Sequence, residues 1–134
     1  MVMEHLLFDR RAKLVYAALW AAAWLGASAA LLLPLGISTP GRSDLLGHFL
    51  LFGALAFGAV AFSRRAGQLA WLALITIALG TALEFAQNLV PYRTSEPIDA
   101  VANSLGAVAG YSAALLVLRF VIRPAELRWS GAAP

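Results

Sequence analysis

LAWLALITIALGTALEFAQNLV, residues 69–90, is the stretch that decides the fold of this 134-residue chain. It is apolar almost throughout and carries one charged side chain, Glu84. A helix that rises ~1.5 Å per residue crosses the ~30 Å hydrocarbon core of a bilayer with about this many residues. Because lipid offers the backbone no hydrogen-bond partners, such a segment must satisfy its own peptide groups as a helix. The stretch therefore predicts a transmembrane helix.

Three further apolar runs accompany it, at residues 14–33, 45–62 and 101–118. Across the chain, 61% of the residues are hydrophobic and only 13% are charged, against about 25% charged in a typical soluble domain. We predict an all-α fold, a single transmembrane domain over residues 1–134. Its predicted spans are about 14–35, 44–62, 68–90 and 98–122. The short links between the spans, rich in Pro, Gly and Ser, predict antiparallel neighbours in an up-down bundle of four transmembrane helices.

The basic residues predict the orientation of this bundle. Eight of the ten flank one set of helix ends: Arg10, Arg11, Lys13, Arg64, Arg65, Arg119, Arg123 and Arg128. Only Arg42 and Arg93 flank the other set. Positive charge accumulates on the cytoplasmic side of membrane proteins, so both termini are predicted to be cytoplasmic. The basic charges are scattered over three segments at the membrane edge, which argues against nucleic acid as a partner.

A cleaved signal peptide is the competing interpretation of the first span. Ala27-Ser28-Ala29 has the small-x-small form of a cleavage site. The apolar run nevertheless continues to Leu33, which is longer than a usual signal core. We therefore expect the first span to be retained as a helix that supports the others.

Polar side chains within the other three spans are the candidate functional residues, because polar groups are costly at membrane depth. They come in pairs at helical spacing: Asp44 with His48, Glu84 with Gln87, and Asp99 with Asn103. All six lie toward the predicted outer side. The chain has no cysteine, which excludes thiolate metal sites and cysteine nucleophiles.

Helical periodicity places these side chains on the faces best suited to close helix contact. Gly80, Glu84, Gln87 and Pro91 share one stripe of the third span, with Glu84 ~10 Å below Pro91. Asp99, Asn103, Gly106 and Gly110 share one stripe of the fourth, where the two glycines form a small-x-x-x-small surface. The stripes predict an outward-facing polar pocket between the second, third and fourth helices, with Glu84 as its deepest charge.

Three patterns occur in order along the chain: Asp44-x-x-x-His48-x-x-x-Phe52, Glu84-x-x-Gln87-x-x-x-Pro91-x-Arg93 and Asp99-x-x-x-Asn103-x-x-Gly106-x-x-x-Gly110. Together they resemble the VanZ-like family of small bacterial membrane proteins. The resemblance covers roughly residues 40–112. Family members often carry Lys directly after the first Asp, whereas this chain has Leu45, so a role for a cation at that position is not carried over.

The resemblance implies a multi-pass protein of the bacterial cytoplasmic (inner) membrane that acts in cell-envelope biology. The namesake of the family is associated with resistance to teicoplanin, a glycopeptide antibiotic that bears a fatty chain. An outward pocket at headgroup depth suits an amphiphile. The expected partners are therefore membrane lipids, a lipid-linked envelope intermediate or a lipoglycopeptide.

The residue types allow more than one chemistry. Three carboxylates and one imidazole suffice for acid–base catalysis, or for holding a hard divalent ion through oxygen ligands and one nitrogen. Arg93, with Arg42 as a second candidate, is suited to hold a phosphate or carboxylate from outside. We predict one ligand-binding set: Asp44, His48, Glu84, Gln87, Arg93, Asp99 and Asn103. No metal or cofactor is assigned.

Three classes of function follow from this set. The favoured class is a binding protein without catalysis, because no nucleophile-plus-base pair or phosphate-binding motif is apparent. The second is a membrane enzyme acting on an envelope lipid, with catalytic candidates His48, Glu84, Asp44 and Asp99. An ion-coupled transporter is least favoured, because the polar residues occupy only the outer half of the spans.

Each candidate also has a structural interpretation. Asp44, with Ser43 as its rival, and Asp99 are placed to cap helices. Gln87 and Asn103 are residue types that join membrane helices by hydrogen bonds, and Arg93 has Glu96 and Glu84 as potential ion-pair partners. Glu84 is the hardest to explain structurally, since a buried carboxylate must be paired or protonated.

Overall fold

The computed structural model describes residues 10–33, 42–91 and 96–124, and this part of the chain is helical throughout apart from short turns. The elements are α2 (Arg10–Leu32), α3 (Arg42–Gly58), the 3₁₀ turn η1 (Ala59–Phe62), α4 (Ala66–Gln87), α5 (Pro97–Val117) and the π-helical turn η2 (Leu118–Ile122). Four helical segments are long and apolar enough to span a membrane: Arg11–Leu32, Asp44–Phe62, Ala66–Gln87 and Pro97–Ile122. The prediction of four transmembrane helices is confirmed.

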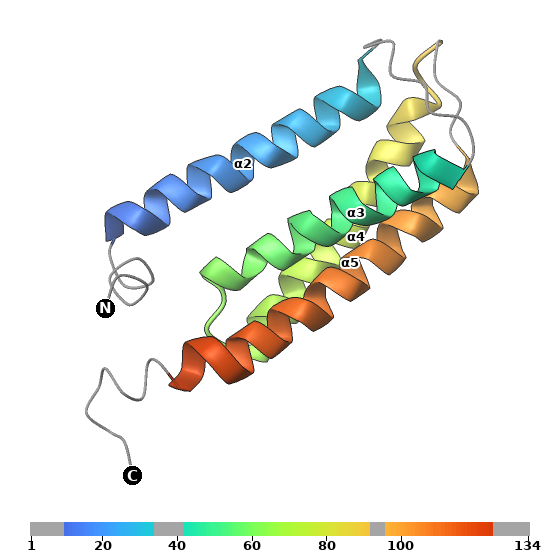
Figure 1. The fold of residues 1–134 in the computed structure, drawn as a ribbon. Helices are drawn as coiled ribbons and strands as arrows, with labels where there is room; N and C mark the ends of the chain where they lie inside the picture. Colours follow the sequence, from blue (N-terminus) through green and yellow to red (C-terminus); the bar gives the residue numbers. More distant parts are fainter. Residues whose placement is uncertain (1–9, 34–41, 92–95, 125–134) are drawn as a thin grey trace.

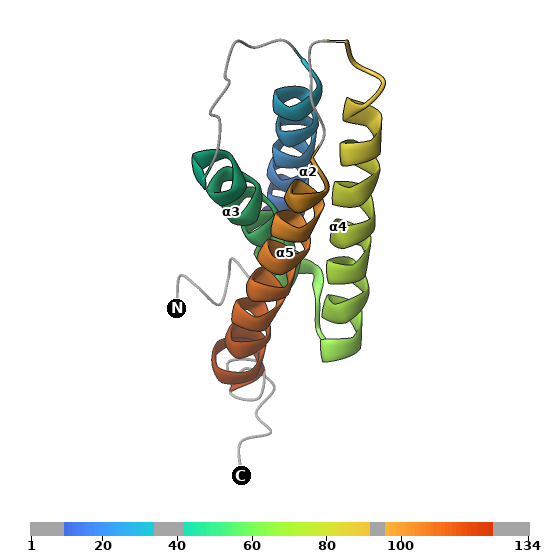
Figure 2. The ribbon, with the colours of Figure 1, turned by 90° about the vertical axis from the view of Figure 1, so that its right-hand side faces the viewer.

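The chain direction alternates from helix to helix (Figure 1). The start of α2, the link from η1 to α4 and the end of η2 lie at one end of the bundle. We call this the basic end, because Arg11, Lys13, Arg64, Arg65, Arg119 and Arg123 lie there. At the opposite end, α3 and α5 begin and α4 ends. Figure 2 shows α5 between α3 and α4, and these two contacts are the most extensive between helices.

The third helix ends earlier than predicted, at Gln87. The next three backbone N–H groups bond three residues back, to the carbonyls of Phe85, Ala86 and Gln87, at 3.0–3.2 Å. These turn bonds replace helical ones because Pro91 follows and disfavours helical backbone in the residue before it. Pro91 is therefore exposed outside the helix and does not extend the buried stripe of Gly80, Glu84 and Gln87.

Glycine allows α3 and α5 to pack at backbone contact. A Cβ atom on Gly106 would collide with the carbonyl oxygen of Phe49, and one on Gly110 would collide with that of Gly53. Membrane helices gain much of their association from such close approach, because lipid provides little hydrophobic driving force between them. The predicted small-x-x-x-small surface is thus the tightest interface among the described helices.

Helix α2 is largely exposed and is tied to α3 by aromatic side chains. The Tyr16 hydroxyl donates to the Gly58 carbonyl at 3.2 Å, and the Trp20 indole N–H donates to the Leu55 carbonyl at 2.9 Å. Both acceptors lie in the last turn of α3, where helical carbonyls lose their usual partners. Trp24 packs edge-on against Phe52 with a centroid distance of 6.1 Å. These contacts agree with the supporting role expected for the first helix.

The interior of the bundle changes character along its length. Near the basic end it is apolar, and Ala59, Val60, Leu69, Ala114, Leu118 and Ile122 form one buried cluster. Near the opposite end the interior between α3, α4 and α5 is polar instead. Phe52 is fully buried between the two zones and lies against Gly80, where a Cβ atom would meet its ring.

Candidate functional site

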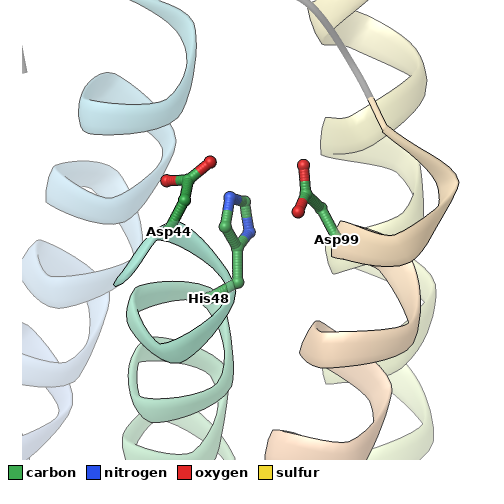
Figure 3. Close-up of side chains that lie close together, drawn as sticks. All are labelled: Asp44, His48 and Asp99. Carbon is green, nitrogen blue, oxygen red and sulfur yellow. The ribbon is translucent and has the colours of Figure 1, made fainter. Parts of the chain in front are cut away.

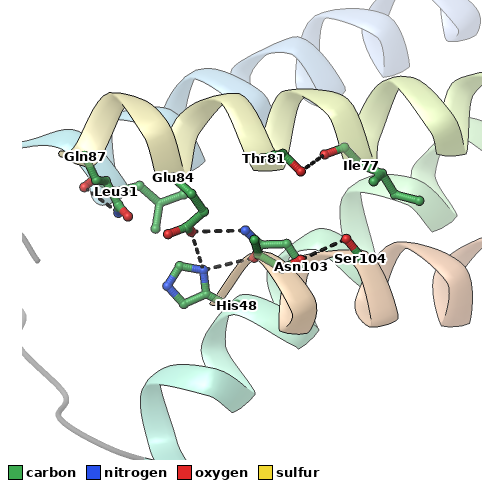
Figure 4. A network of polar contacts seen from close by, with 9 residues as sticks. Leu31, His48, Ile77, Thr81, Glu84, Gln87, Asn103 and Ser104 are labelled. Atoms are coloured by element: carbon green, nitrogen blue, oxygen red, sulfur yellow. Dashed lines mark hydrogen bonds and ion pairs between the residues drawn. The ribbon is translucent and has the colours of Figure 1, made fainter. Parts of the chain in front are cut away.

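Buried polar side chains gather where α3 and α5 begin and α4 ends (Figure 4). Five of them are at most 6% exposed: His48, Glu84, Gln87, Asp99 and Asn103. Asn103 is the most deeply buried, at 1% exposed. Four of the five belong to α4 and α5 and lie on the faces that the helical stripes predict to point inward. The fold therefore concentrates its costly polar groups in one place.

The centre of the site, which we call the central trio, consists of Glu84, His48 and Asn103, one from each of three helices. Asn103 donates through Nδ2 to Glu84 Oε1 at 3.1 Å. Its Oδ1 lies 2.9 Å from His48 Nδ1, and the same ring nitrogen lies 3.4 Å from Glu84 Oε1. These bonds connect α3, α4 and α5 through side chains alone.

The contacts within the central trio indicate which ring nitrogen of His48 carries the proton. Asn103 presents its NH₂ group to Glu84 and its amide oxygen to His48, and an amide oxygen only accepts hydrogen bonds. The Nδ1 of His48 is therefore the donor to Asn103. In the neutral ring this leaves Nε2 with a free lone pair, and Figure 4 shows that nitrogen pointing away from Glu84 and Asn103.

His48 also belongs to a second group, which we call the rim triad, with Asp44 and Asp99. Figure 3 shows the imidazole between the two carboxylates. One ligand-type atom from each residue lies within 4.8 Å of the others. Asp44 reaches His48 along one face of α3 because the two are four residues apart, while Asp99 comes from the first turn of α5. His48 thus links the rim triad to the central trio.

Helix capping accounts for part of the surroundings of Asp99 and not for Asp44. Helix α3 already begins at Arg42, so Asp44 lies inside its first turn. In α5 the capping position is Glu96, which makes no side-chain capping bond. Asp44 makes no side-chain hydrogen bond to another described residue, whereas the carboxylate of Asp99 has a hydrogen bond with the backbone of Glu96. The helix dipole favours both charges, yet Asp99 is buried among polar groups, at 6% exposed.

Gln87 lies apart from the central trio. Its Nε2 donates to the carbonyl oxygen of Leu31 at 3.1 Å. Leu31 is in the last turn of α2, and its carbonyl has no helical partner among the described residues. The bond joins α4 to α2, as the interpretation of Gln87 as a link between helices predicts. No sequence signal indicates Leu31 as the acceptor, since any residue supplies a backbone carbonyl.

Two buried acceptor atoms at this end have no hydrogen-bond partner among the described residues: Glu84 Oε2 and Gln87 Oε1. Buried polar atoms are satisfied in most proteins. The cluster therefore retains unused acceptor capacity. Arg93 lies outside the described residues, as does the side chain of Arg42. Their predicted contact with an anion, and the predicted ion pair of Arg93 with Glu96 or Glu84, are therefore not part of this geometry.

Comparison with known proteins gives one match. The family model described as VanZ/LLP1 matches residues 4–119, which include all four helices and every member of the central trio and the rim triad. No curated protein and no solved structure matches the chain.

Proposed function

The chain belongs to the VanZ/LLP1 family, and from this premise we propose that it is an envelope protein that binds the polar head of a lipid-like ligand at the buried polar cluster. The proposed ligand class includes lipoglycopeptides of the teicoplanin type, and the proposed role is in resistance to them. The proposed location is the bacterial cytoplasmic membrane. The cluster faces outward and the basic end faces the cytoplasm.

The observation that carries this proposal is the central trio. Glu84, His48 and Asn103 come from three helices and meet in the interior of a membrane domain, where each polar group is costly. Asn103 alone would suffice to join two helices by hydrogen bonds. A carboxylate with an orphaned oxygen, beside an imidazole and two further carboxylates, is more than helix packing requires.

An amphiphile suits the surroundings of the cluster. The outer faces of α3 and α5 next to it expose Leu46, Leu50, Ile98, Val101 and Leu105. A ligand whose head reaches the cluster would lay its chain along these side chains or in the adjacent lipid. This arrangement supports a ligand with a polar head and an apolar tail over a water-soluble metabolite.

A membrane enzyme is the second candidate, and the rim triad favours it. An imidazole between two carboxylates is a common arrangement for moving protons in acid–base catalysis. An enzyme would convert an added envelope lipid into a new species, whereas a binding protein would return it unchanged. Incubation of the purified protein with labelled lipid extract, followed by chromatography, separates the two candidates.

The binding experiment uses the protein purified in nanodiscs of phosphatidylglycerol and phosphatidylcholine. We expect saturable binding of teicoplanin. Binding of the same glycopeptide without its fatty chain should be at least tenfold weaker. Equal binding of both forms, or binding equal to that of empty nanodiscs, would refute the proposal. Expression in a sensitive bacterium should raise the inhibitory concentration of teicoplanin more than that of the deacylated form.

The orientation is tested by cysteine accessibility, since the natural chain contains no cysteine. We expect a membrane-impermeant thiol reagent to label Ser95→Cys in intact cells and to label Ala66→Cys only after the membrane is opened. The reason is that Ala66 starts α4 at the basic end, which positive charge holds in the cytoplasm. The reverse labelling pattern would overturn the proposed topology.

A further inference from the structure

We propose that Asp44, His48 and Asp99 bind a divalent transition-metal ion, Zn²⁺ or Mn²⁺, whose open coordination positions take an oxyanion of the ligand head. The second half of this statement rests on the proposed function, whereas the metal site stands without it. The donor set is one imidazole nitrogen and two carboxylate oxygens, contributed by α3 and α5.

The geometry of the rim triad suits an ion. The three donor atoms lie within 4.8 Å of one another. An ion ~2.0–2.2 Å from each donor would set them ~3–4 Å apart. The remaining difference is small, and we expect rotation of the Asp44 and Asp99 side chains to close it and complete a three-ligand site.

The hydrogen bonds behind His48 are a second, independent observation. Metal-bound histidines usually donate their other ring N–H to a carboxylate or carbonyl oxygen, which fixes the tautomer and the ring plane. Here Nδ1 lies 2.9 Å from Asn103 Oδ1 and 3.4 Å from Glu84 Oε1. Nε2 is thereby left with the lone pair that a metal requires, on the side of the ring away from Asn103 and Glu84 (Figure 4).

The balance of charge also calls for a cation. Asp99 is 6% exposed, and the hydrogen bond of its carboxylate with the backbone of Glu96 involves a neutral group, which leaves the negative charge without a cationic partner among the described residues. No Lys or Arg in the described part of the chain pairs with Asp44, Glu84 or Asp99. Buried charges in proteins are paired or coordinate metals, and an ion at the rim triad would satisfy the two aspartates together.

The donor types select the class of ion. Ca²⁺ and Mg²⁺ favour all-oxygen sites, whereas an imidazole ligand favours transition ions such as Zn²⁺. With only three protein ligands, at least one coordination position stays open, as in catalytic zinc sites. A phosphate or carboxylate oxygen is the natural fourth ligand, which would bring an anionic head to an otherwise acidic cluster.

The test uses the full chain without a histidine tag, stripped with chelator and titrated calorimetrically with Zn²⁺ and with Mn²⁺. We expect about one ion per chain for at least one of the two metals, with Kd in the micromolar range or below. Asp99→Asn and Asp44→Asn should weaken binding at least tenfold. Glu96→Gln, an exposed carboxylate of the same helix end, should bind as the natural protein does.

A spectroscopic measurement on the natural protein tests the proposal even if the aspartate variants do not fold. The chain has two histidines, His5 and His48. In the Mn²⁺ complex of the natural protein, pulsed paramagnetic resonance should detect coupling to one imidazole nitrogen. The coupling should persist in His5→Gln and vanish in His48→Gln. Absence of coupling when Mn²⁺ is bound, its dependence on His5, binding of Mg²⁺ or Ca²⁺ only, or no binding at all would each overturn the proposal.

The outcomes also separate this proposal from the proposed function. Teicoplanin binding that is unchanged in excess chelator would refute the role of the ion and leave the ligand-binding function intact. One tightly bound ion without any ligand binding would support the metal site and refute the binding function.

Discussion

Gly106→Ala is expected to destabilise the bundle by about 3 kcal/mol, the upper end of the usual cost of overpacking. The new Cβ atom would collide with the carbonyl oxygen of Phe49 and would lie only 2.9 Å from the carbonyl carbon and 3.0 Å from the Cα atom of that residue. All three obstacles are backbone atoms, so no rotamer change relieves the contact. Helices α3 and α5 would have to separate, and the polar groups that they hold together would separate with them.

Gly47→Ala is the matched control, because Gly47 also lies within a helix but has nothing within 4 Å of its Cβ position. Alanine stabilises a helix interior by roughly 0.5–1 kcal/mol relative to glycine, so this variant should be neutral or slightly stabilised. Unfolding of each variant in mixed micelles, monitored by far-UV circular dichroism, gives its free energy of unfolding. Equal stability of Gly106→Ala and Gly47→Ala would show that α3 and α5 do not pack at backbone contact.

Glu84→Ala and His48→Ala are expected to abolish ligand binding, with at least a hundredfold loss of affinity, while the helices remain inserted. Removal of one member of a buried hydrogen-bonded group leaves its partners unsatisfied and costs about 1–3 kcal/mol. In Glu84→Ala the orphaned groups are the Asn103 NH₂ and the His48 ring. Insertion should survive, since removing a charge from a span favours insertion by roughly 2.5–3.5 kcal/mol.

Glu84→Gln refines this experiment. It preserves the side-chain volume and one acceptor oxygen for Asn103, so the bundle should remain folded while the charge is lost. We expect at least a tenfold loss of teicoplanin affinity in this variant, and none in Glu96→Gln. Loss of membrane insertion or of the folded bundle in Glu84→Gln would show that the cluster is structural. Unchanged affinity in a folded protein would remove Glu84 from the binding site.

Much of the architecture follows from the sequence alone. The spans are predictable because each apolar run is long enough to cross the bilayer, and lipid forces such a run to be helical. The inward face of α5 is predictable because Asp99, Asn103, Gly106 and Gly110 recur at helical spacing, and all four are buried. The same reasoning places Glu84 on an inward face of α4.

The end of α4 shows a local limit of that reasoning. Apolar residues continue beyond Gln87, so composition places the end of the span at residue 90. Hydropathy measures only the preference for lipid, whereas the helix ends where turn bonds and Pro91 compete with helical bonds. Prediction from composition therefore gives the span and misses the last turn.

The sequence by itself determined the number of helices, their inward faces and the residue types that share the polar end of the bundle. Only the tertiary structure decided which polar atoms meet. It placed Nδ1 of His48 against Asn103 and Glu84, brought Asp99 of α5 together with Asp44 and the imidazole, and directed Gln87 to the backbone of α2. The physical reason is that periodicity within one helix fixes a face, whereas the partner of each side chain depends on how neighbouring helices pack, and here glycines on α5 set the closest approach.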